Sequence, residues 1–402
     1  MDFFETDRAR EYRETLEAFM DECVYPAEKI IKDELREGGN PHAFPPTLEK
    51  LKNEAKSRGL WNLFHPHENQ GPALSNVEYA GLAEIMGRSP HIAPEACNCS
   101  APDTGNMEIL ELFGTEEHRS QWLDPLLEGT IRSAFCMTEP GVASSDATNI
   151  SMSMQRGDGG FILNGRKWFA SNAMHPNLRV LIVMGKTSPD AKPHRQQSML
   201  VVPADAQGVS VVRNLPVFGY HDREGHAEVH FEDVFVPDKD ILLGEGRGFE
   251  IAQARLGPGR IHHCMRAIGM AERALELLCQ RASIRTTFGR SLSERDNIRD
   301  WIAESRIDID MARLLTLKAA WTMDEYSNKA ARQEIAAIKV VAPRIALKVI
   351  DRAIQVFGAE GVTDDVPLAE FWAGLRALRL ADGPDEVHLR TVAKAELRKH
   401  HD

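Results

Sequence analysis

The chain has 402 residues, which is too long for one ordinary core and predicts two or three domains. Hydrophobic residues make up 43% of it and charged residues 27%, a balance typical of a globular protein. The net charge of -12 argues against a nucleic acid as partner, because such binding needs clustered Lys and Arg that neutralise phosphates.

The start of the chain, MDFFETDRAR, is acidic and lacks an apolar run, so it does not resemble a signal peptide. No stretch is long and apolar enough to span a bilayer, and we expect no integral membrane segment. The sequence therefore predicts a cytoplasmic protein. A mitochondrial location would require that a targeting segment has been removed.

The cysteines are spread along the chain without the CxxC spacing of redox motifs and many zinc sites. This distribution predicts buried or free thiols, with no disulfide and no metal site. The cysteines are Cys23, Cys97, Cys99, Cys136, Cys264 and Cys279.

Residues 1–133 follow a helical pattern, with apolar side chains recurring about every three to four residues. We expect Pro26 to interrupt the first helix, because proline removes a backbone donor. Joints rich in Pro and Gly are expected at 38–46, 65–72 and 89–94. The apolar positions are Tyr12, Leu16, Phe19, Met20 and Cys23, then Leu48, Leu51 and Ala55, and then Tyr79, Leu82, Ala83 and Met86.

Residues 134–245 change to a strand pattern and predict a compact β domain. Asn164-Gly165 lies between apolar residues, and such a pair predicts a hairpin turn because both turn positions need positive φ. Further strand-like runs are 180–184, 199–202, 209–212 and 227–236.

Residues 246–402 return to a helical period and predict a bundle of amphipathic helices. One helix is expected to start after Pro258, and another to be kinked at Pro343. The glycine-rich run 244–248 precedes them and is interpreted as a hinge between domains. The helices are expected around Met265, Ile268 and Leu275, around Ile307, Met311, Leu314 and Leu315, around Ile335, Ile338, Ile345 and Val349, over 370–381, and after Pro384.

The run FCMTEPGVASSDATNI, from Phe135 to Ile150, is too polar and too rich in turn residues for a helix interior. It is interpreted either as an ordinary Pro-Gly turn or as a loop that binds a ligand. Its Thr-Glu-Pro and Ser-Asp elements resemble the signature of the acyl-CoA dehydrogenase family. The order of helical, β and helical parts matches that family over essentially the whole chain.

The resemblance implies an α+β multidomain fold, with an N-terminal helical domain (1–133), a middle β-barrel or sandwich domain (134–245) and a C-terminal four-helix bundle (246–402). It also implies that FAD is the cofactor. In the family this loop and a Lys-Met-Trp-Ile-Thr segment hold the flavin ring, and GRKWFASNA resembles that segment here. The aromatic pair could otherwise belong to a β core. Which of Ser144 and Ser145 faces the flavin is open. The flavin-ring candidates are Phe135, Met137, Thr138, Ser144, Ser145, Trp168, Phe169, Ala170 and Ser171.

Asp382 precedes Gly383-Pro384 and is either a helix cap or a catalytic base. It occupies the position where many relatives carry a catalytic Glu, and the earlier position that other relatives use is Gly259 here, which has no acid. The resemblance therefore implies that Asp382 removes the α-proton of the substrate. Arg260, Ser145, Asp382 and Gly383 are the expected substrate-binding residues.

The segments RTTFG and QVFGA resemble family segments that reach the pyrophosphate and adenosine of a cofactor held by a neighbouring subunit, which implies a homodimer or homotetramer. An Arg on a helix surface could otherwise be only a solvated charge. The candidates are Arg285, Phe288, Gln355, Val356, Gly358, Ala359, Pro384 and Glu386.

A run opening at Gly257 is expected to begin a helix whose amides favour an anion. Its neighbours His262, His263 and Cys264 are adjacent on that helix and point to different sides, so a metal site is not expected. The GxGxxG spacing of nicotinamide sites and the GxSxG motif of esterases are both absent from the motifs considered.

The phrase ADGPDEVH is most similar to the branch that includes human family members ten and eleven, without their kinase-like domain. The resemblance implies an FAD-dependent dehydrogenase that converts an acyl-CoA to the trans-2-enoyl-CoA in fatty-acid β-oxidation and passes electrons to an electron-transfer flavoprotein. The alternatives are a nitroalkane oxidase-like or acyl-CoA oxidase-like flavoprotein that uses oxygen, and an inactive scaffold of the same fold.

Overall fold

The computed structural model describes residues 5–67 and 70–400. The first residues of the acidic start, and part of the joint expected at 65–72, lie outside these ranges. The chain divides into two compact units. The bundle unit comprises 1–26, 73–94 and 257–402, and the sheet unit comprises 27–72 and 95–256. Within the described ranges, none of the helices combines the length and the apolar character that crossing a bilayer requires.

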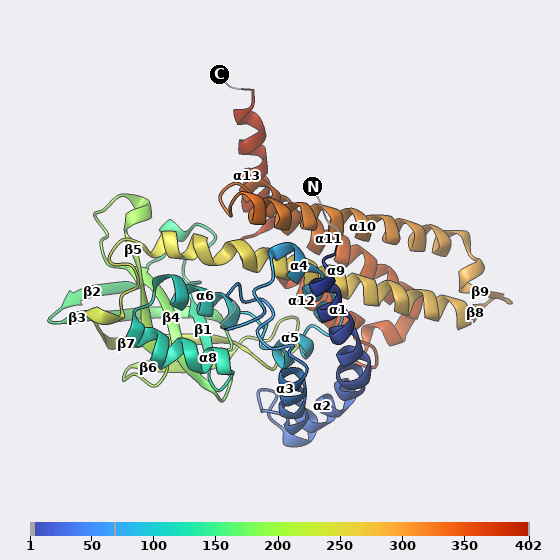
Figure 1. Cartoon of the computed structure of the whole chain (residues 1–402), viewed down its shortest axis with the longest axis horizontal. Helices are drawn as coiled ribbons and strands as arrows, with labels where there is room; N and C mark the ends of the chain where they lie inside the picture. Colours follow the sequence, from blue (N-terminus) through green and yellow to red (C-terminus); the bar gives the residue numbers. More distant parts are fainter. Residues whose placement is uncertain (1–4, 68–69, 401–402) are drawn as a thin grey trace. The chain divides into compact units, whose positions relative to one another are not determined.

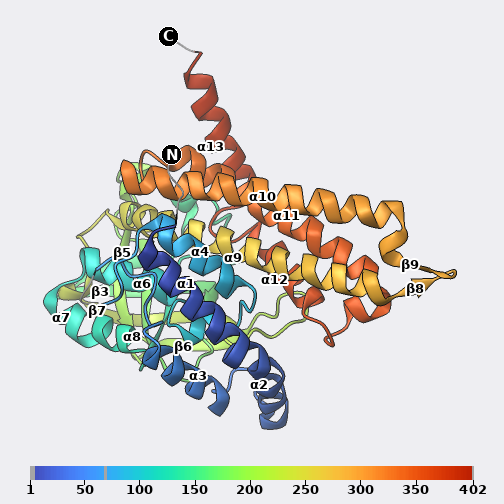
Figure 2. The ribbon, with the colours of Figure 1, turned by 45° about the vertical axis from the view of Figure 1, so that its right-hand side comes forward.

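The bundle unit is built from long helices that run side by side (Figures 1 and 2). Helix α11 packs against α10, α12 and α13, while α4 packs against α10 and α1. A short hairpin of β8 and β9 projects from the end of the bundle (Figures 1 and 2). The elements are α1 (Asp7–Phe19), α4 (Asn76–Gly87), α9 (Gly248–Ile284, in this unit from residue 257), β8 (Thr286–Thr287), β9 (Arg290–Ser291), α10 (Asp296–Glu325), α11 (Arg332–Phe357), α12 (Leu368–Leu378) and α13 (Asp385–Arg398).

Helix α4 is fixed at both ends by specific contacts. Ser75 and Glu78 form a capping box at its start, and the Asp324 carboxylate accepts from the backbone N–H of Asn76 at 3.0 Å. Near its other end α4 crosses α9 so closely that a Cβ on Gly269 would overlap the carbonyl oxygen of Glu84. Glycine at this crossing is what lets the two backbones touch.

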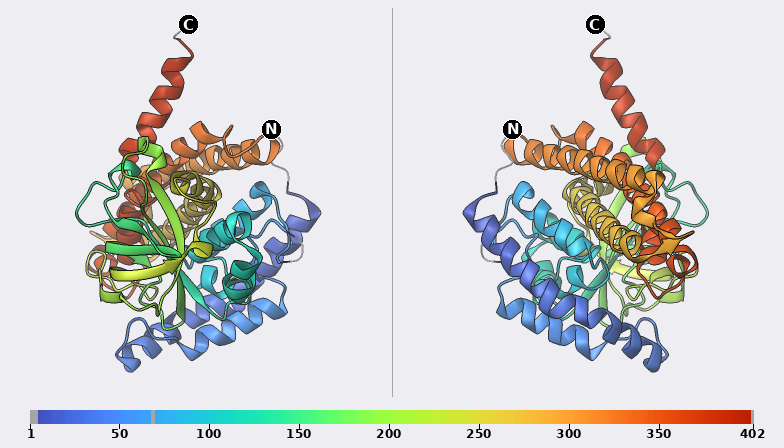
Figure 3. Two further views of the ribbon diagram at one scale, coloured as in Figure 1. Left: turned by 90° about the vertical axis from the view of Figure 1, so that its left-hand side faces the viewer. Right: turned by 90° about the vertical axis from the view of Figure 1, so that its right-hand side faces the viewer.

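The sheet unit holds a curved sheet with helices around it, and Figure 3 shows the strands curving. The strand order is β1-β4-β2-β3-β7-β6, with β5 pairing to β4. Strands β1 and β4 are parallel, while β3 pairs with β2 and β7 in antiparallel fashion. The elements are α2 (Tyr25–Gly38, in this unit from residue 27), α3 (Pro46–Ser57), α5 (Ala93–Ala96, in this unit from residue 95), α6 (Asp103–Phe113), α7 (Glu116–His118), α8 (Asp124–Glu128), β1 (Arg132–Cys136), β2 (Ser153–Gly157), β3 (Gly160–Ser171), β4 (Leu178–Lys186), β5 (Gln197–Pro203), β6 (Val209–Asn214) and β7 (His226–Pro237).

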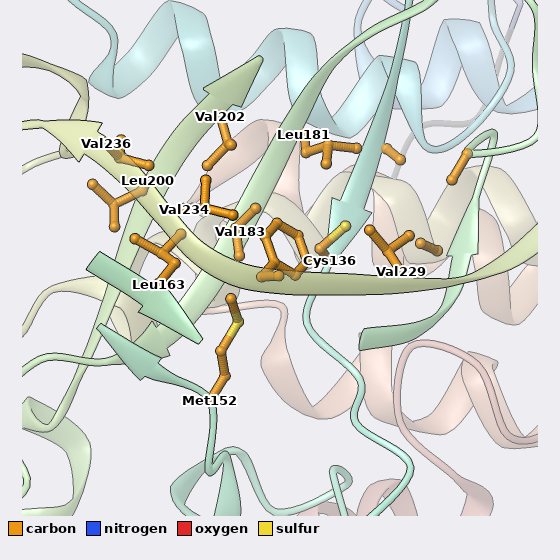
Figure 4. Packing of buried hydrophobic residues seen from close by; sticks show 14 of the residues in the cluster. Cys136, Met152, Leu163, Leu181, Val183, Leu200, Val202, Val229, Val234 and Val236 are labelled. Atoms are coloured by element: carbon orange, nitrogen blue, oxygen red, sulfur yellow. The ribbon is translucent and has the colours of Figure 1, made fainter. Parts of the chain in front are cut away.

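One face of this sheet forms a hydrophobic core, which Figure 4 shows from close by. Most strands contribute buried residues from one face, since successive side chains point to opposite faces, whereas β6 contributes only the partly buried Val209. Burying one such side chain stabilises the fold by about 1.5–3 kcal/mol. The labelled members are Cys136, Met152, Leu163, Leu181, Val183, Leu200, Val202, Val229, Val234 and Val236.

The end of β3 is tied to α6 by a buried carboxylate. Asp103 accepts from the backbone N–H of Ser133 at 2.7 Å and from the side-chain amide of Asn172 at 3.0 Å. Burial raises the pKa of Asp103, although Arg132 and these hydrogen bonds oppose the rise. The segment that carries Ser171 is thereby held in place.

Most sequence predictions of elements are confirmed. The four strand-like runs after residue 179 lie within β4, β5, β6 and β7, and the predicted helices over 307–315, 335–349 and 370–381 correspond to α10, α11 and α12. Four of the cysteine thiols are buried, those of Cys97, Cys99, Cys136 and Cys264, and those of Cys23 and Cys279 are half-buried. The domain limits at 133 and 245 stay predictions.

The hairpin predicted at Asn164-Gly165 is wrong. Both residues lie inside the continuous strand β3, where the register shifts opposite β7. Asn164 accepts from the Asp233 backbone N–H at 2.8 Å, so the asparagine completes a β-bulge rather than a turn. The actual hairpin joins β2 to β3 through Asp158-Gly159, with Gly159 at φ +71°.

Two proline predictions are also wrong. Pro26 does not interrupt its helix, because a π-helical turn over Met20–Val24 leads directly into α2 and Pro26 is the second residue of α2. Such a turn locally changes the hydrogen-bond pattern of a helix. Pro258 does not precede its helix, because α9 is already helical from Gly248. The amides near Gly257 are therefore engaged inside a helix, and the anion site expected there has no helix start to form it.

Candidate active site

The loop that follows β1 is held in place by the buried ion pair of Glu139 and Lys167. Glu139 is 3% exposed and its carboxylate accepts from Lys167 Nζ at 2.8 Å, from the Ser151 backbone N–H at 2.8 Å and from the Met152 backbone N–H at 2.9 Å. Burial alone would raise the pKa of Glu139, but Lys167 and these hydrogen bonds lower it, so the carboxylate stays ionised. The glutamate of the Thr-Glu-Pro element thus holds the loop on β3.

The two serines of the loop have different surroundings. The Ser144 Oγ accepts from the backbone N–H of Glu139 at 2.9 Å and so stabilises the loop itself. Ser145 is exposed. This geometry favours Ser145 as the serine that faces a ligand.

The aromatic pair on β3 lies in a β-bulge. Trp168 and Phe169 lie opposite the single residue Glu228 of β7, and Phe169 has φ +51°. The bulge turns the Phe169 ring outward, leaving it 46% exposed, beside the Trp168 ring at a centroid distance of 5.3 Å. The Trp168 backbone N–H donates to the Thr138 carbonyl at 2.9 Å, so the bulge and the loop lie side by side.

The remaining flavin-ring candidates divide by burial. Phe135 and Met137 are half-buried and alternate along the chain with the core residue Cys136. Ala170 is fully buried in the core, so its side chain faces away from any ligand. Ser171 is half-buried at the end of β3.

Asp382 lies in the turn between α12 and α13, with φ +55°. Its backbone carbonyl accepts from Arg260 Nη2 at 3.1 Å and from His388 Nε2 at 3.2 Å. Gly383, at φ +96°, lets the chain pass His388, whose Nε2 would be 3.0 Å from an added Cβ. Arg260, predicted to bind substrate, therefore holds the turn of the predicted base.

The side chain of Asp382 is 22% exposed and has basic neighbours. His263 Nε2 lies 3.5 Å from its Oδ2, and Arg266 Nη2 lies 3.2 Å from His263 Nδ1. Lys339 is also buried. Burial lowers the pKa of Lys339, and the electrostatic effects of Cys264 and Asp382 oppose this decrease. Burial and the nearby cations Arg260 and Lys339 lower the pKa of His388 to about 4.

The start of α13 is anchored by Asp385 rather than by Asp382. Asp385 is 2% exposed and accepts from Arg344 Nε at 2.9 Å and from Arg379 Nη2 at 2.7 Å. Pro384 is the residue before the helix, and Glu386 is exposed in its first turn. The helix-cap alternative for Asp382 is not what the structure has, since Pro384 takes the cap position.

Most of the predicted pyrophosphate and adenosine residues lie at the end of α9 and of α11, whereas Pro384 and Glu386 lie at the start of α13. Arg285 and the 99% exposed Phe288 belong to the projecting hairpin, and Arg281, one turn before it, pairs with Glu360 at 2.7 Å. Gln355 lines a pocket of about 420 Å³ with Trp301, Lys348, Asp351 and Arg352. Gly358 and Ala359 are exposed beyond α11, whereas the Val356 side chain is buried.

The predicted residues thus form three groups. The loop and bulge group lies in the sheet unit, and the Asp382 group and the hairpin group lie in the bundle unit. The structure adds side chains that the sequence predictions missed: His263, Arg266, Lys339 and His388 around Asp382, and His226 and Asp222 beside Ser171. Of these side chains, the sequence motifs pointed only to His263, which was considered with His262 as a possible metal ligand.

The architecture is that of the acyl-CoA dehydrogenase fold, with an N-terminal helical part, a middle β part and a C-terminal helical part. Three family models match: the acyl-CoA dehydrogenase N-terminal domain over 6–130, the middle domain over 134–234 and the C-terminal domain over 246–397. The chain belongs to the acyl-CoA dehydrogenase family of oxidoreductases.

Relatives place the chain within the family. It is 57% identical over 400 residues to the probable acyl-CoA dehydrogenase FadE2 of Mycobacterium tuberculosis, covering 99% of this chain and 98% of that one. It is 54% identical to acyl-CoA dehydrogenase family member 11 of Gallus gallus over 98% of this chain, which spans only 51% of that relative. A putative acyl-CoA dehydrogenase from Mycobacterium abscessus has the same fold, with a TM-score of 0.96 at 47% identity, covering 99% and 100% of the two chains.

Members of this family bind FAD. A glutaryl-CoA dehydrogenase from Mycobacterium smegmatis, solved in complex with FADH2, matches this fold with a TM-score of 0.81 at 20% identity, over 97% of this chain and 94% of that one. The exposed Phe169 ring beside an anchored loop is compatible with a flat cofactor, since an aromatic face stacks well on such a ring.

Proposed function

We propose that the chain catalyses FAD-dependent α,β-dehydrogenation of an acyl-CoA thioester to the trans-2-enoyl-CoA, as a homodimer or homotetramer that passes electrons to an electron-transfer flavoprotein. The observation that carries the proposal is the hydrogen bond between Trp168 and Thr138. It joins the two segments that the family resemblance assigns to the flavin ring.

The residues of the loop and bulge group would hold the cofactor. Phe169 offers an exposed ring and Ser145 and Ser171 offer hydroxyl groups. Thr138 lies on the anchored loop, where its carbonyl accepts from the Trp168 N–H. FAD, when bound, supplies the acceptor for the hydride that leaves the β-carbon. The protein's task is to orient the thioester and to take up the α-proton.

Asp382 would take the α-proton at its side-chain oxygens. Its backbone carbonyl accepts from Arg260 and from His388, which holds the turn that carries the carboxylate. Neighbouring His263 and Lys339 are basic and would stabilise the carboxylate before proton transfer. A base positioned in this way typically contributes about 10²–10⁴-fold to a rate.

The test is the variant Asp382→Asn, mixed anaerobically with a panel of acyl-CoA thioesters. We expect the variant to stay yellow with bound FAD while flavin bleaching slows by about 10²–10⁴-fold. Asp300→Asn, at an exposed position of α10, is the matched control and should bleach like the unaltered protein. Full bleaching of Asp382→Asn would rule out this base.

The same experiment separates the rival functions. Peroxide release during turnover in air would identify oxygen as the acceptor and support an oxidase. A purified protein that is colourless and takes up no FAD would support the inactive scaffold. The acyl-CoA that bleaches the flavin fastest would define the chain length and branching of the substrate.

A further inference from the structure

Three polar side chains of the sheet unit form a line beside the bulge. Ser171, the last residue of β3, pairs in register with His226, the first residue of β7. The Ser171 Oγ lies 2.8 Å from His226 Nδ1, and His226 Nε2 lies 2.7 Å from Asp222 Oδ2. The side chains of His226 and Asp222 are 26% and 20% exposed, so the line is partly shielded from water.

The direction of these hydrogen bonds follows from their chemistry. An ionised carboxylate only accepts, so His226 Nε2 carries the hydrogen that is donated to Asp222. In the neutral ring Nδ1 is then an acceptor, and the Ser171 hydroxyl must donate its hydrogen to it. The lone pairs of the Ser171 oxygen remain available to a third group.

The backbone supports this arrangement. The His226 N–H donates to the Asn214 side-chain oxygen at 2.9 Å, which fixes the start of β7. The Phe169 ring lies 6.1 Å from the His226 ring, measured between centroids, so the exposed aromatic of the bulge lies beside the middle residue of the line.

We propose that His226 and Asp222 are positioning residues that make the Ser171 oxygen a hydrogen-bond acceptor toward the flavin. This inference rests on the proposed function, in which Ser171 faces the cofactor. The ring nitrogen that receives the hydride has only a lone pair in the oxidised flavin and carries a hydrogen in the reduced flavin. An acceptor at Ser171 therefore complements the reduced form alone, and it raises the tendency of the flavin to take up the hydride.

The proposal predicts an order of flavin midpoint potentials in the FAD-loaded protein. Ser171→Ala removes the acceptor and should lower the potential. His226→Ala should lower it further, because the hydroxyl can then turn and donate to the oxidised ring. We expect His226→Ala to shift the equilibrium about tenfold toward the oxidised form, which is about 30 mV for a two-electron couple. Ser171→Thr keeps the hydroxyl, so the flavin of this variant should have the midpoint potential of the unaltered protein.

The matched control is His230→Ala. His230 lies on the same strand and makes a similar contact, 2.9 Å from Glu228 Oε1, but it holds no hydroxyl group. The flavin of the His230→Ala protein should have the same midpoint potential as the flavin of the unaltered protein. A yellow His226→Ala protein with a potential equal to or above the unaltered one would overturn the inference while leaving the proposed function intact. An unaltered protein that is purified colourless and takes up no FAD would overturn both.

A second measurement needs no bound cofactor. Nitrogen NMR of the full chain labelled with ¹⁵N-histidine, assigned by comparison with His226→Ala, reports which ring nitrogen carries the hydrogen. We expect it on Nε2 of His226. A hydrogen on Nδ1 would reverse the Ser171 hydroxyl and refute the inference.

Discussion

Asp382 shows how neighbouring side chains can hold the backbone of a single residue in place. The Arg260 guanidinium and the His388 ring both donate to its carbonyl, and Gly383 lets the backbone of the turn pass close to the His388 ring. The turn that carries the predicted base is therefore held through its backbone.

His388 gives this turn a pH dependence. The pKa of His388 is lowered to about 4 from 6.5, so between these values the unfolded chain binds a proton that the folded chain does not. The free energy of unfolding should therefore fall as pH decreases from 6.5 toward 4, by up to about 1.4 kcal/mol per pH unit from this residue. In His388→Gln, thermal unfolding scans across this range should show a shallower decline. His400→Gln, at an exposed histidine, should decline like the unaltered protein; equal slopes in all three would contradict the assignment.

At this scale the sequence predicted local backbone conformation better than it predicted side-chain contacts. The position of Asp382 outside a helix follows from Gly383-Pro384, which is local information. The role of Arg260 depends on a partner 122 residues away, and that of Glu139 on Lys167, 28 residues away. Such pairings arise from tertiary packing, which residue type and spacing do not encode.

At the scale of elements, the errors came from local signals that the tertiary structure overrides. Asn164-Gly165 has the composition of a turn. Its asparagine nevertheless pairs with Asp233 on the neighbouring strand, and the chain continues as one uninterrupted strand. Asp158-Gly159, a signal of the same kind, is the real turn. Composition alone does not separate a bulge from a turn, because both use residues that tolerate unusual backbone angles.

The crossing of α4 and α9 provides a test at this scale. Gly269→Ala would place a Cβ against the Glu84 carbonyl and force the helices apart, so we expect destabilisation of about 1–3 kcal/mol. Gly81→Ala is the matched control on α4, where an added Cβ meets nothing within 4 Å. It should stabilise the protein by roughly 0.5–1 kcal/mol, since alanine favours helix. Chemical denaturation of both variants measures the difference, and a neutral Gly269→Ala would argue against the close crossing.

At the scale of the whole molecule, the bundle carries apolar groups that a single copy leaves in water. The Phe288 ring is 99% exposed, and Ile307, Met311 and Leu314 on α10 are each more than half exposed. Their spacing places the three α10 residues on one helix face. These surfaces support the proposal that a second copy covers them and that Phe288 and Gln355 reach the cofactor of that copy.

Replacing Phe288 should therefore affect assembly and cofactor together. We expect Phe288→Ala to weaken FAD retention at least about tenfold, and more so on dilution, because a buried aromatic at an interface is commonly a hot spot. Sedimentation velocity combined with the ratio of flavin to protein absorbance measures both effects. Phe218→Ala, at another exposed phenylalanine, should change neither. An assembled Phe288→Ala protein with full FAD content would refute the shared site.

The buried pair of Glu139 and Lys167 has a consequence for how the ligand loop responds to its ligand. The amides of Ser151 and Met152 end on the same carboxylate, so the loop gives up its conformational entropy when the chain folds and has little left to lose when a cofactor arrives. Hydrogen exchange at these amides should be equally slow in the empty and the loaded protein. The loop would then bind the cofactor as a preformed site, without a large change in its conformation.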